Sequence, residues 1–421
     1  MSNYSSEFLQ VLHERGYIHQ CTNSEALDIF LSKNQTNAYI GFDCTASSLH
    51  IGSLVQIMML RWLQRTGHKP IVLLGGGTSQ VGDPSGRDES RKLLDTNTIL
   101  QNKIGIKKCF EQFLSFGNET NGAILVDNQE WLNPLQYLEF LREFGRHFSI
   151  NRMLTFDSVK QRLEREQPLS FLEFNYMILQ AYDFVELHDR FDCRLQMGGS
   201  DQWGNIVNGV ELCRRTNGKE VYGLTTPLIT LASGAKMGKT AKGAVWLSNE
   251  ILSPYEYWQF WRNTADGDVG RFLRLFTELS LEEIIKLEAL KDAELNEAKK
   301  LLATEATTLC HGKKAAINAA NSAYQTFEEG GIGNNLPETV LSIETLSMGV
   351  QLLDLLVGPT YGLQLAKSKG EARRLIRGGG IRINDQQVTD EARVVTNKDL
   401  NKERLIKLSA GKKRHALVKQ K

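Results

Sequence analysis

The feature that most constrains the fold of this chain is an alternation of short apolar runs with helical patterns between residue 38 and about residue 230. Apolar runs typical of buried strands occupy residues 38–42, 70–74, 123–126 and 224–231. Helical spacing of apolar residues follows at 51–63, 134–147, 170–182 and 203–215. This alternation predicts an α/β domain with a doubly wound parallel sheet. Ligands of such sheets bind at the carboxyl ends of the strands.

The rest of the chain divides into smaller regions, because 421 residues exceed one ordinary core. Helical patterns rich in Ala, Leu, Glu and Lys predict an all-α middle domain. A glycine-rich stretch reads as a linker, and a small, mixed α+β domain follows it. The predicted boundaries are 1–248, 249–330, 331–344 and 345–421.

Composition excludes several classes of protein. No apolar run is long enough to span a bilayer, and the N-terminus resembles neither a secretory signal nor a transit peptide. We therefore expect a cytoplasmic protein without a membrane partner. The six cysteines form no CxxC pair and the eight histidines are dispersed, so we expect no metal held by the protein itself.

The net charge of +1 hides an asymmetry along the chain. Residues 358–421 carry 16 Lys and Arg against 6 Asp and Glu, a net charge of +10. The remainder carries 34 against 43, a net charge of −9. A basic tail on an acidic body fits a polyanionic partner, and on charge alone it fits a solvated basic face equally well.

Two glycine-containing segments have the chemistry of a nucleotide site. Residues 43–53 join the first strand to a helix, where amide donors and the helix dipole favour a phosphate. There His50 can donate to phosphate oxygens, and Gly52 lets a planar base approach the backbone. Residues 233–240 present two lysines, Lys236 and Lys239, to a triphosphate. Each segment alone also fits a structural turn or a surface loop.

Together, in this order and at this separation, the segments resemble the two signature motifs of class I aminoacyl-tRNA synthetases. The Lys236-Met237-Gly238-Lys239-Thr240 variant is similar to that of the bacterial-type tyrosyl branch, whose catalytic domain is Rossmann-like. Ser53 departs from the pattern, because the first motif usually ends in a second histidine. The resemblance implies ATP with Mg²⁺ as a substrate and no tightly bound cofactor.

The resemblance also assigns roles on the nucleotide side. It implies that phosphate charge is stabilised by His50, Lys236, Lys239, Thr240, Arg87 and Arg91. The last two lie in the loop that follows the second strand, where an ordinary turn with two surface arginines is the alternative. Contacts to ATP or the adenylate are implied for Asp43, Thr45, His50, Gly52, Ser53, Asp201 and Lys239. Without the family, the turn around Asp201 is only a glycine-rich loop with an acid.

A polar stripe marks the predicted amino-acid site. Tyr176, Gln180 and Asp183 fall at i, i+4 and i+7 in an otherwise apolar helix, so they share one face. Such a stripe is either exposed or directed at a ligand. The segment resembles the amino-acid pocket of tyrosyl-tRNA synthetases. That resemblance implies that Tyr176, Gln180 and Asp83 bind the α-amino group of tyrosine. It further assigns Asp183 and Tyr39 to the phenolic hydroxyl and Gln202 to the carboxylate.

The basic end of the chain resembles an S4-type RNA-binding domain. A predicted helix carries Lys369, Arg373, Arg374 and Arg377, ends at a triple glycine and precedes a short strand. The resemblance implies tRNA(Tyr) as a partner. It also implies a homodimer, whose interface we expect around residues 131–148 and Phe171.

Three alternatives remain open from the sequence. A tryptophanyl-tRNA synthetase shares the fold and chemistry but would lack the basic tail domain. An RNA-binding protein that lost catalysis is favoured only by Ser53, and the lysines of residues 233–240 argue against it. A small-molecule nucleotidyltransferase would not need the basic tail or the helical middle domain.

Overall fold

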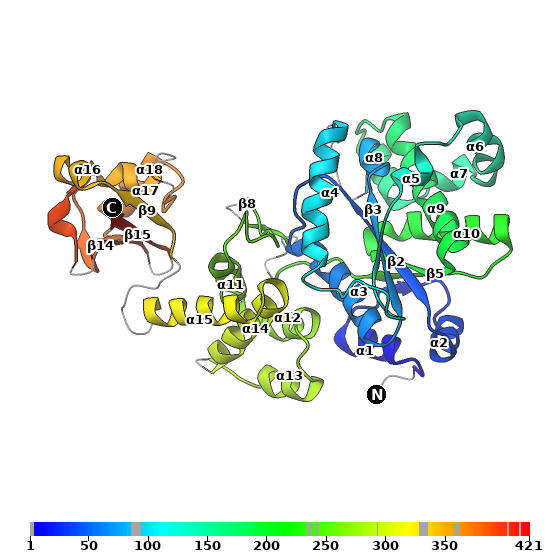
Figure 1. Cartoon of the computed structure of the whole chain (residues 1–421), viewed down its shortest axis with the longest axis horizontal. Helices are drawn as coiled ribbons and strands as arrows, with labels where there is room; N and C mark the ends of the chain where they lie inside the picture. The colour runs from blue at the N-terminus through cyan, green and yellow to red at the C-terminus, as the bar shows by residue number, and fades with distance from the viewer. Residues whose placement is uncertain are drawn as a thin grey trace. The chain divides into compact units, whose positions relative to one another are not determined.

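The structure is a computed structural model. It describes residues 4–85, 94–232, 234, 237–240, 243–292, 294–327, 336–357, 361, 363–401, 404–411 and 414–421, with the backbone alone at 157–158, 239–240 and 325–327. The chain divides into two compact units, Met1–Ala316 and Ile317–Lys421. The division falls inside helix α15 (Lys313–Phe327), and each unit has its own sheet (Figure 1).

The first unit is built on a six-stranded sheet with the order β1-β6-β5-β2-β3-β4. Its strands are β1 (Gln20–Cys21), β2 (Asn37–Asp43), β3 (Lys69–Gly75), β4 (Ile124–Asp127), β5 (Cys193–Gly199) and β6 (Tyr222–Thr226). The pairs from β6 to β4 are parallel, as predicted. Strand β1 adds an antiparallel edge to β6 that the sequence did not indicate.

Helices cover both faces of this sheet, which confirms the doubly wound α/β class (Figure 1). Side chains alternate between the faces, so Tyr39, Ile71 and Leu73 form one core with α9 and α10. Phe42 faces the other way, with its ring centroid 4.8 Å from that of Phe110 in α4. The helices of this part are α1 (Glu7–Arg15), α2 (Ser24–Lys33), α3 (Leu54–Arg65), α4 (Thr96–Phe110), α5 (Gln129–Leu132), α6 (Tyr137–Glu143), α7 (Ile150–Met153), α8 (Asp157–Glu164), α9 (Phe171–Phe191) and α10 (Trp203–Asn217).

One predicted strand is shifted. The apolar run at 224–231 was expected to be a strand throughout, but β6 begins at Tyr222 and ends at Thr226. Pro227 follows at once, and proline has no N–H with which to continue the ladder. The carboxyl end of the strand therefore lies earlier than the apolar run suggests.

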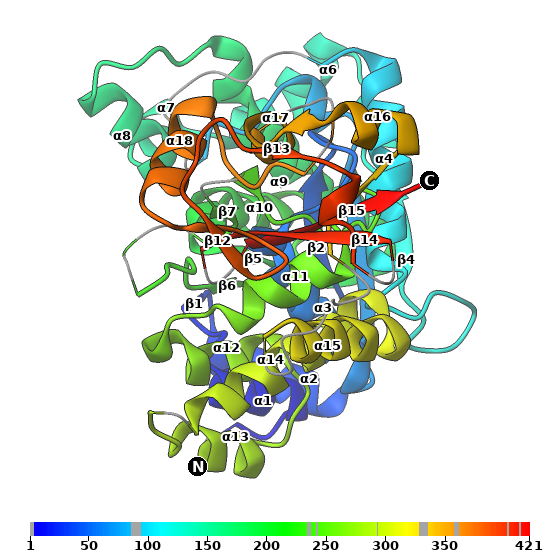
Figure 2. The same ribbon diagram turned by 90° about the vertical axis from the view of Figure 1, so that its left-hand side faces the viewer.

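Helices follow the sheet, as expected for the middle of the chain. They are α11 (Pro254–Arg262), α12 (Val269–Phe276), α13 (Leu281–Glu288), α14 (Leu295–His311) and α15. Helix α12 packs against α1 and α3 (Figure 2). Arg15 of α1 donates to the carbonyl oxygen of Thr277 over 3.0 Å, and Arg61 of α3 pairs with Glu278 at 2.7 Å. These bonds join the helical region to the sheet domain within the first unit.

The second unit is a small α+β fold, as predicted. Its five-stranded sheet has the order β12-β11-β14-β15-β9, and a separate pair joins β10 to β13. Its elements are β9 (Glu338–Leu341), α16 (Ile343–Met348), β10 (Val350–Gln351), α17 (Leu352–Val357), α18 (Lys369–Arg377), β11 (Ile381–Ile383), β12 (Gln386–Val388), β13 (Val394–Val395), β14 (Leu405–Ala410) and β15 (Arg414–Gln420). Within the described parts of both units, no helix is long and apolar enough to cross a membrane.

Candidate active site

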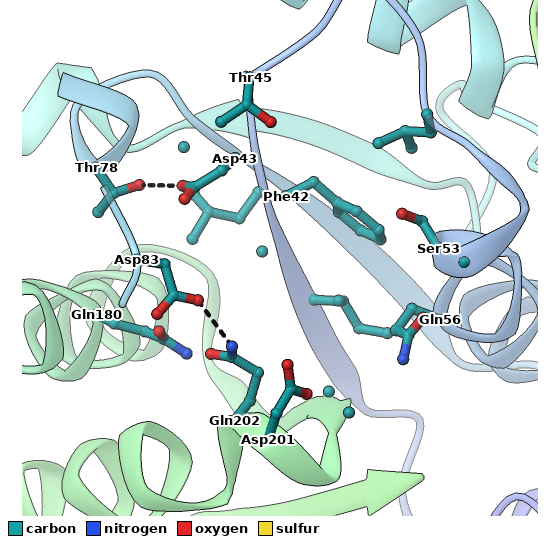
Figure 3. A pocket seen from close by; sticks show the side chains of 18 of the residues that line it. Phe42, Asp43, Thr45, Ser53, Gln56, Thr78, Asp83, Gln180, Asp201 and Gln202 are labelled. Atoms are coloured by element: carbon teal, nitrogen blue, oxygen red, sulfur yellow. Dashed lines mark hydrogen bonds between the residues drawn. The ribbon is translucent and has the colours of Figure 1, made fainter. Parts of the chain in front are cut away.

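A cavity of about 570 Å³ lies at the carboxyl ends of the parallel strands. Asp43 at the end of β2, Gly75 at the end of β3 and Gly199 at the end of β5 all line it. Polar side chains from these strand ends, from α9 and from the start of α10 converge on it (Figure 3). The cavity is where a doubly wound sheet is expected to bind its ligand.

Most of the predicted site residues line this single cavity. They are Tyr39, Asp43, Thr45, His50, Gly52, Ser53, Asp83, Tyr176, Gln180, Asp183, Asp201 and Gln202. The predicted Arg87, Arg91 and Lys236 lie outside the described residues. Lys239 and Thr240 form strand β7, which pairs with β8 (Gly243–Ala244), and only their backbone is described.

His50 stands at the junction between β2 and α3. It is the N-cap of a short 3-10 turn, Ile51–Ser53, and its Nδ1 accepts a hydrogen bond from the N–H of Gly52 at 3.0 Å. Because Nδ1 accepts, the neutral imidazole carries its hydrogen on Nε2. His50 can therefore act as a donor to an anionic oxygen without bearing a charge itself.

The second signature segment packs directly on this junction. The N–H of Ile51 donates to the carbonyl oxygen of Val245 at 2.9 Å. A Cβ added to Gly52 would lie 2.6 Å from Cε1 of His50, and one added to Gly238 would lie 3.1 Å from Nδ1 of His50. Gly238 also has φ +112°, a conformation that L side chains rarely adopt. Gly52 is thus favoured by its close approach to the His50 ring, and Gly238 is favoured chiefly by its backbone geometry.

The wall formed by α9 confirms that the polar stripe points inward. Ser170 caps the helix in a capping box with Glu173, and Glu173 pairs with the buried Arg162 at 2.9 Å. This fixes the start of the helix, and Tyr176 and Asp183 are then buried against the cavity. The alternative of an exposed stripe is wrong for these residues.

Asp183 is an acid of the site with a strongly perturbed pKa. Burial raises the pKa of its carboxyl to about 7, and two hydrogen bonds oppose that rise. Asn128 donates its Nδ2 to Oδ2 over 3.0 Å, and Trp131 donates its Nε1 to Oδ1 over 2.8 Å. Neither donor was predicted to be functional, although both follow directly on the third predicted strand. Trp131 is buried behind Asp183, so its side chain supports that carboxyl and is not part of the surface expected for an interface.

The hydroxyl of Tyr39 is left without a partner in this pocket. It is buried, and among the described residues it has no hydrogen-bond partner. Burial first, and then the charge of Asp183, raises the pKa of Tyr39 well above its usual range. A buried hydroxyl without a partner costs about 1–3 kcal/mol. A ligand that brings its own hydroxyl between Tyr39 and Asp183 would remove that cost.

Amide side chains organise a second part of the cavity. Gln202 donates its Nε2 to Asp83 over 2.8 Å (Figure 3). Asn205 donates its Nδ2 to the side-chain oxygens of Gln180 at 2.9 Å and Gln202 at 3.1 Å. The resulting chain of dipoles sets the orientation of both glutamines. Asn205 was not singled out in the sequence.

Asp43 joins the two sides of the cavity. It accepts a hydrogen bond from the hydroxyl of Thr78 at 3.0 Å (Figure 3) and another from the hydroxyl of Tyr176 at 3.2 Å. Thr78 in turn accepts from Nδ2 of Asn128 at 3.1 Å. A continuous polar network therefore runs from Asp43 to Asp183, so the two carboxylates are held in fixed relative positions.

The predicted basic helix of the second unit forms as α18. Ser368 caps it, and Ala372 and Ile376 bury its apolar side. Lys369 pairs with Asp354 at 2.7 Å, while Arg373, at 3.8 Å, and Arg377 both pair with Glu391. Among the described residues no ion pair engages the exposed Arg374. Of the four predicted RNA contacts, Arg374 is therefore the one whose charge is not already matched by a neighbouring acid.

Comparisons with known proteins agree with this geometry. The family described as tRNA synthetases class I (W and Y) matches residues 31–328, and the tyrosine–tRNA ligase SYY-like C-terminal domain matches residues 332–418. A tyrosine–tRNA ligase of Rhodospirillum rubrum is 60% identical over 100% of this chain and 99% of its own length. One from Zymomonas mobilis is 60% identical over 99% of each chain.

Solved structures show the same fold. The C-terminally truncated mitochondrial tyrosyl-tRNA synthetase of Aspergillus nidulans aligns with a TM-score of 0.69 and 32% identity, over 76% of this chain and 94% of that one. The cavity lies at the ends of the sheet strands, and the two signature segments meet at His50. This combination defines a class I aminoacyl-tRNA synthetase. Within that class, this chain belongs to the tyrosine–tRNA ligases. The predicted family and fold are thereby confirmed.

Proposed function

We propose that the cavity activates L-tyrosine with Mg-ATP and that the product is then transferred to tRNA(Tyr). In the first step the tyrosine carboxylate attacks the α-phosphate, which forms tyrosyl adenylate as pyrophosphate leaves. In the second step a hydroxyl of the 3′-terminal ribose of the tRNA attacks the adenylate carbonyl, and AMP leaves. No side-chain nucleophile is required, so positioning and charge stabilisation supply the catalysis.

The observation that carries the choice of tyrosine is the pair of Tyr39 and Asp183. A buried acceptor and a buried hydroxyl without a partner line the same cavity. We assign both to the phenolic hydroxyl of the substrate, which Asp183 accepts. Tyr176, Gln180 and Asp83 are assigned to the α-amino group, and Gln202 to the carboxylate. Tyr176 already donates to Asp43, so its hydroxyl oxygen remains able to accept from an ammonium group.

On the nucleotide side, the Nε2 hydrogen of His50 is assigned to the phosphate that is attacked. Asp201 is assigned to the ribose hydroxyls, with Asp43, Thr45, Gly52 and Ser53 around the adenylate. The residues assigned to the leaving pyrophosphate are Lys236, Lys239, Thr240, Arg87 and Arg91. Cations there would neutralise the charge that develops as the α–β bond breaks. Magnesium is proposed to arrive with ATP.

Amino-acid-dependent exchange of labelled pyrophosphate into ATP tests this assignment. We expect fast exchange with tyrosine, very much slower exchange with phenylalanine and none above background with tryptophan, because only tyrosine offers a phenolic hydroxyl to Asp183. Exchange with tryptophan, or exchange with no amino acid, would contradict the proposal. If tyrosine binds but no exchange occurs, the residues assigned to tyrosine would stand and the residues assigned to ATP would be wrong.

The second unit is proposed to bind tRNA as an S4-like domain, with Lys369, Arg373, Arg374 and Arg377 near the phosphates. Replacing Arg374 with glutamine is expected to weaken tRNA binding roughly threefold to tenfold and to lower the salt slope by about one, because one phosphate contact is lost. Tyrosine activation should stay unchanged, because Arg374 does not line the cavity. Filter binding at several salt concentrations measures both quantities.

Lys419→Gln is a matched control for this experiment. It removes the same charge from the same unit, but Lys419 pairs with Glu338 at 2.5 Å, away from α18. Equal effects of the two substitutions would show that only net charge matters, and would contradict a specific contact by α18.

An exposed apolar surface on α6 to α9 is proposed to form a homodimer interface. Leu138 is 78% exposed and Phe171 is 69% exposed, and Tyr137, Ile150 and Leu163 are exposed as well. Large exposed apolar side chains of this kind are typical of interaction surfaces. A second copy of this chain is the occupant that the family implies, and a cytoplasmic location is proposed on the same basis.

Leu138→Asp is expected to shift the protein from dimer to monomer, because a charge buried in an apolar interface is desolvated without a partner. Sedimentation velocity at several concentrations measures the change. Ile29→Asp is the control, since Ile29 is 49% exposed on α2, outside the proposed interface. A wild-type chain that sediments as a monomer, or equal behaviour of both variants, would exclude this surface as the interface.

A further inference from the structure

Trp246 lies where the two signature segments meet, and it is not among the residues assigned to tyrosine, ATP or tRNA. It follows the β7–β8 hairpin and pairs with His50 in an isolated antiparallel bridge. Flanking backbone bonds extend the contact: the N–H of Leu247 donates to the carbonyl oxygen of Leu49 at 2.9 Å, and that of Ile51 to Val245 at 2.9 Å. The chain after the second segment is therefore tied to the backbone that carries His50.

The side chains of this bridge are also in contact. The ring centroids of His50 and Trp246 are 6.1 Å apart, and their planes are inclined by 71°, in an edge-to-face arrangement. Trp246 is half-buried and lines the cavity beside His50. Aromatic pairs at this distance and angle attract each other through their quadrupoles, which fixes the relative orientation of the rings.

The imidazole is bounded on its other edge as well. Gly52 donates to its Nδ1 at 3.0 Å, a Cβ added to Gly52 would overlap the ring, and a Cβ added to Gly238 would make a tight contact with Nδ1 at 3.1 Å. His50 is therefore bounded by Gly52 of its own segment, by Gly238 of the second segment and by Trp246, which follows the second segment in the chain. Gly52 and Gly238 have no side chain to shorten. Trp246, in contrast, can be changed to a smaller aromatic residue or to an aliphatic one.

We propose that Trp246 is a positioning residue for His50 in the activation step: its indole holds the imidazole so that the Nε2 hydrogen points at the reacting phosphate. This inference rests on the phosphate role proposed for His50. A displacement of a catalytic group by about 1 Å can cost roughly a hundredfold in rate, so the orientation of this ring matters as much as its presence. Trp246 also makes that orientation depend on the chain that follows the second signature segment.

The test is a double-mutant cycle on the full chain. Single-turnover formation of tyrosyl adenylate is measured for Trp246→Leu, Trp246→Phe, His50→Ala and the double variant. We expect Trp246→Leu to slow this step about 10- to 100-fold with the tyrosine dissociation constant within about twofold, because only ring orientation is lost. Trp246→Phe, which keeps an aromatic edge, should stay within about fivefold of the wild type. In the His50→Ala background, Trp246→Leu should have no further effect.

Phe260→Leu is the matched control for loss of an aromatic contact. Phe260 is half-buried in α11, and its ring packs edge-to-face on Trp261 at 5.3 Å, away from the cavity lining. This substitution should leave adenylate formation within about twofold of the wild type, since distant sites act independently. If Trp246→Leu melts more than about 5 °C lower than the wild type, Trp246→Met takes its place in the cycle.

Four outcomes would contradict the proposal. Additive effects of Trp246→Leu and His50→Ala would overturn the positioning role of Trp246 while leaving His50 in place. A rise in the ATP KM with an unchanged rate constant would overturn it in favour of a direct contact between Trp246 and the nucleotide. A Trp246→Phe variant as slow as Trp246→Leu would also contradict it. His50→Ala with wild-type activation would overturn the proposed role of His50 itself, and the inference with it.

Discussion

Replacing Asp183 with asparagine is expected to lower kcat/KM for tyrosine in pyrophosphate exchange by roughly 30- to 150-fold, which corresponds to about 2–3 kcal/mol. A charge-assisted acceptor for the substrate hydroxyl is lost. The new amide also meets two donors, Nδ2 of Asn128 and Nε1 of Trp131. Asn128 is unable to turn its oxygen toward position 183, because that oxygen accepts from the N–H of Gly77 at 2.8 Å. One donor therefore faces another donor whichever way the new amide is turned.

The same substitution should reduce discrimination against phenylalanine by a similar factor, since phenylalanine gains nothing from the acceptor. Exchange rates with the two amino acids, measured side by side, give this ratio. Asp189→Asn makes the identical change at an exposed position of the same helix and should alter neither rate. An unchanged ratio in Asp183→Asn would show that Asp183 does not contact the substrate hydroxyl.

The pH dependence of Asp183 supplies an independent check. Burial raises its pKa from 3.8 to about 7, so the folded protein binds this proton more tightly than the unfolded chain does. The stability that this proton contributes is fully present below 3.8 and is lost as the pH rises through about 7. The free energy of unfolding of the wild type should therefore fall over this range relative to Asp183→Asn. Meanwhile kcat/KM for tyrosine should rise toward pH 8, as the carboxylate forms.

The fold was largely predictable because its strands are strongly apolar. The apolar runs at 38–42 and 70–74 correspond to β2 and β3. A parallel strand that is covered on both faces is apolar along its whole length, so it is easily recognised in the sequence. The inward stripe of α9 was predictable for a related reason. The 3.6-residue period of a helix is sufficient to put Tyr176, Gln180 and Asp183 on one face.

The residues that escaped prediction lack such a period. Asn128 lies 55 residues from Asp183 in sequence, and the two meet because β4 pairs with β3 while α9 packs on the same sheet. Trp131 is a single aromatic residue in a four-residue helix, with no pattern that separates it from core residues. Strand β1 has two residues, Gln20 and Cys21, and is defined by backbone bonds to β6 and not by its side chains. These features depend on topology, which local sequence does not encode.

Replacing His50 with alanine is expected to slow adenylate formation about 100- to 1000-fold, because one preorganised donor to the transition-state phosphate is lost. The tyrosine dissociation constant should stay within about twofold, since the predicted tyrosine contacts come from β2, the loop after β3, α9 and the 3-10 turn before α10, and not from His50. Single-turnover quench flow measures the rate, and equilibrium dialysis measures the affinity. His13→Ala, at an exposed position on α1, is the control.

Two amide substitutions at position 50 show which of the two ring nitrogens of His50 donates to the phosphate. In His50→Asn the side-chain amide nitrogen takes the place of Nδ1, and in His50→Gln it reaches toward the place of Nε2. Because Nδ1 already accepts from Gly52, the donor to phosphate must be Nε2. His50→Gln should therefore retain activity within about tenfold of the wild type, while His50→Asn should be nearly as slow as His50→Ala. The reverse order would mean that the ring donates through Nδ1 in the transition state, and that the hydrogen bond from Gly52 is broken before the phosphate is attacked.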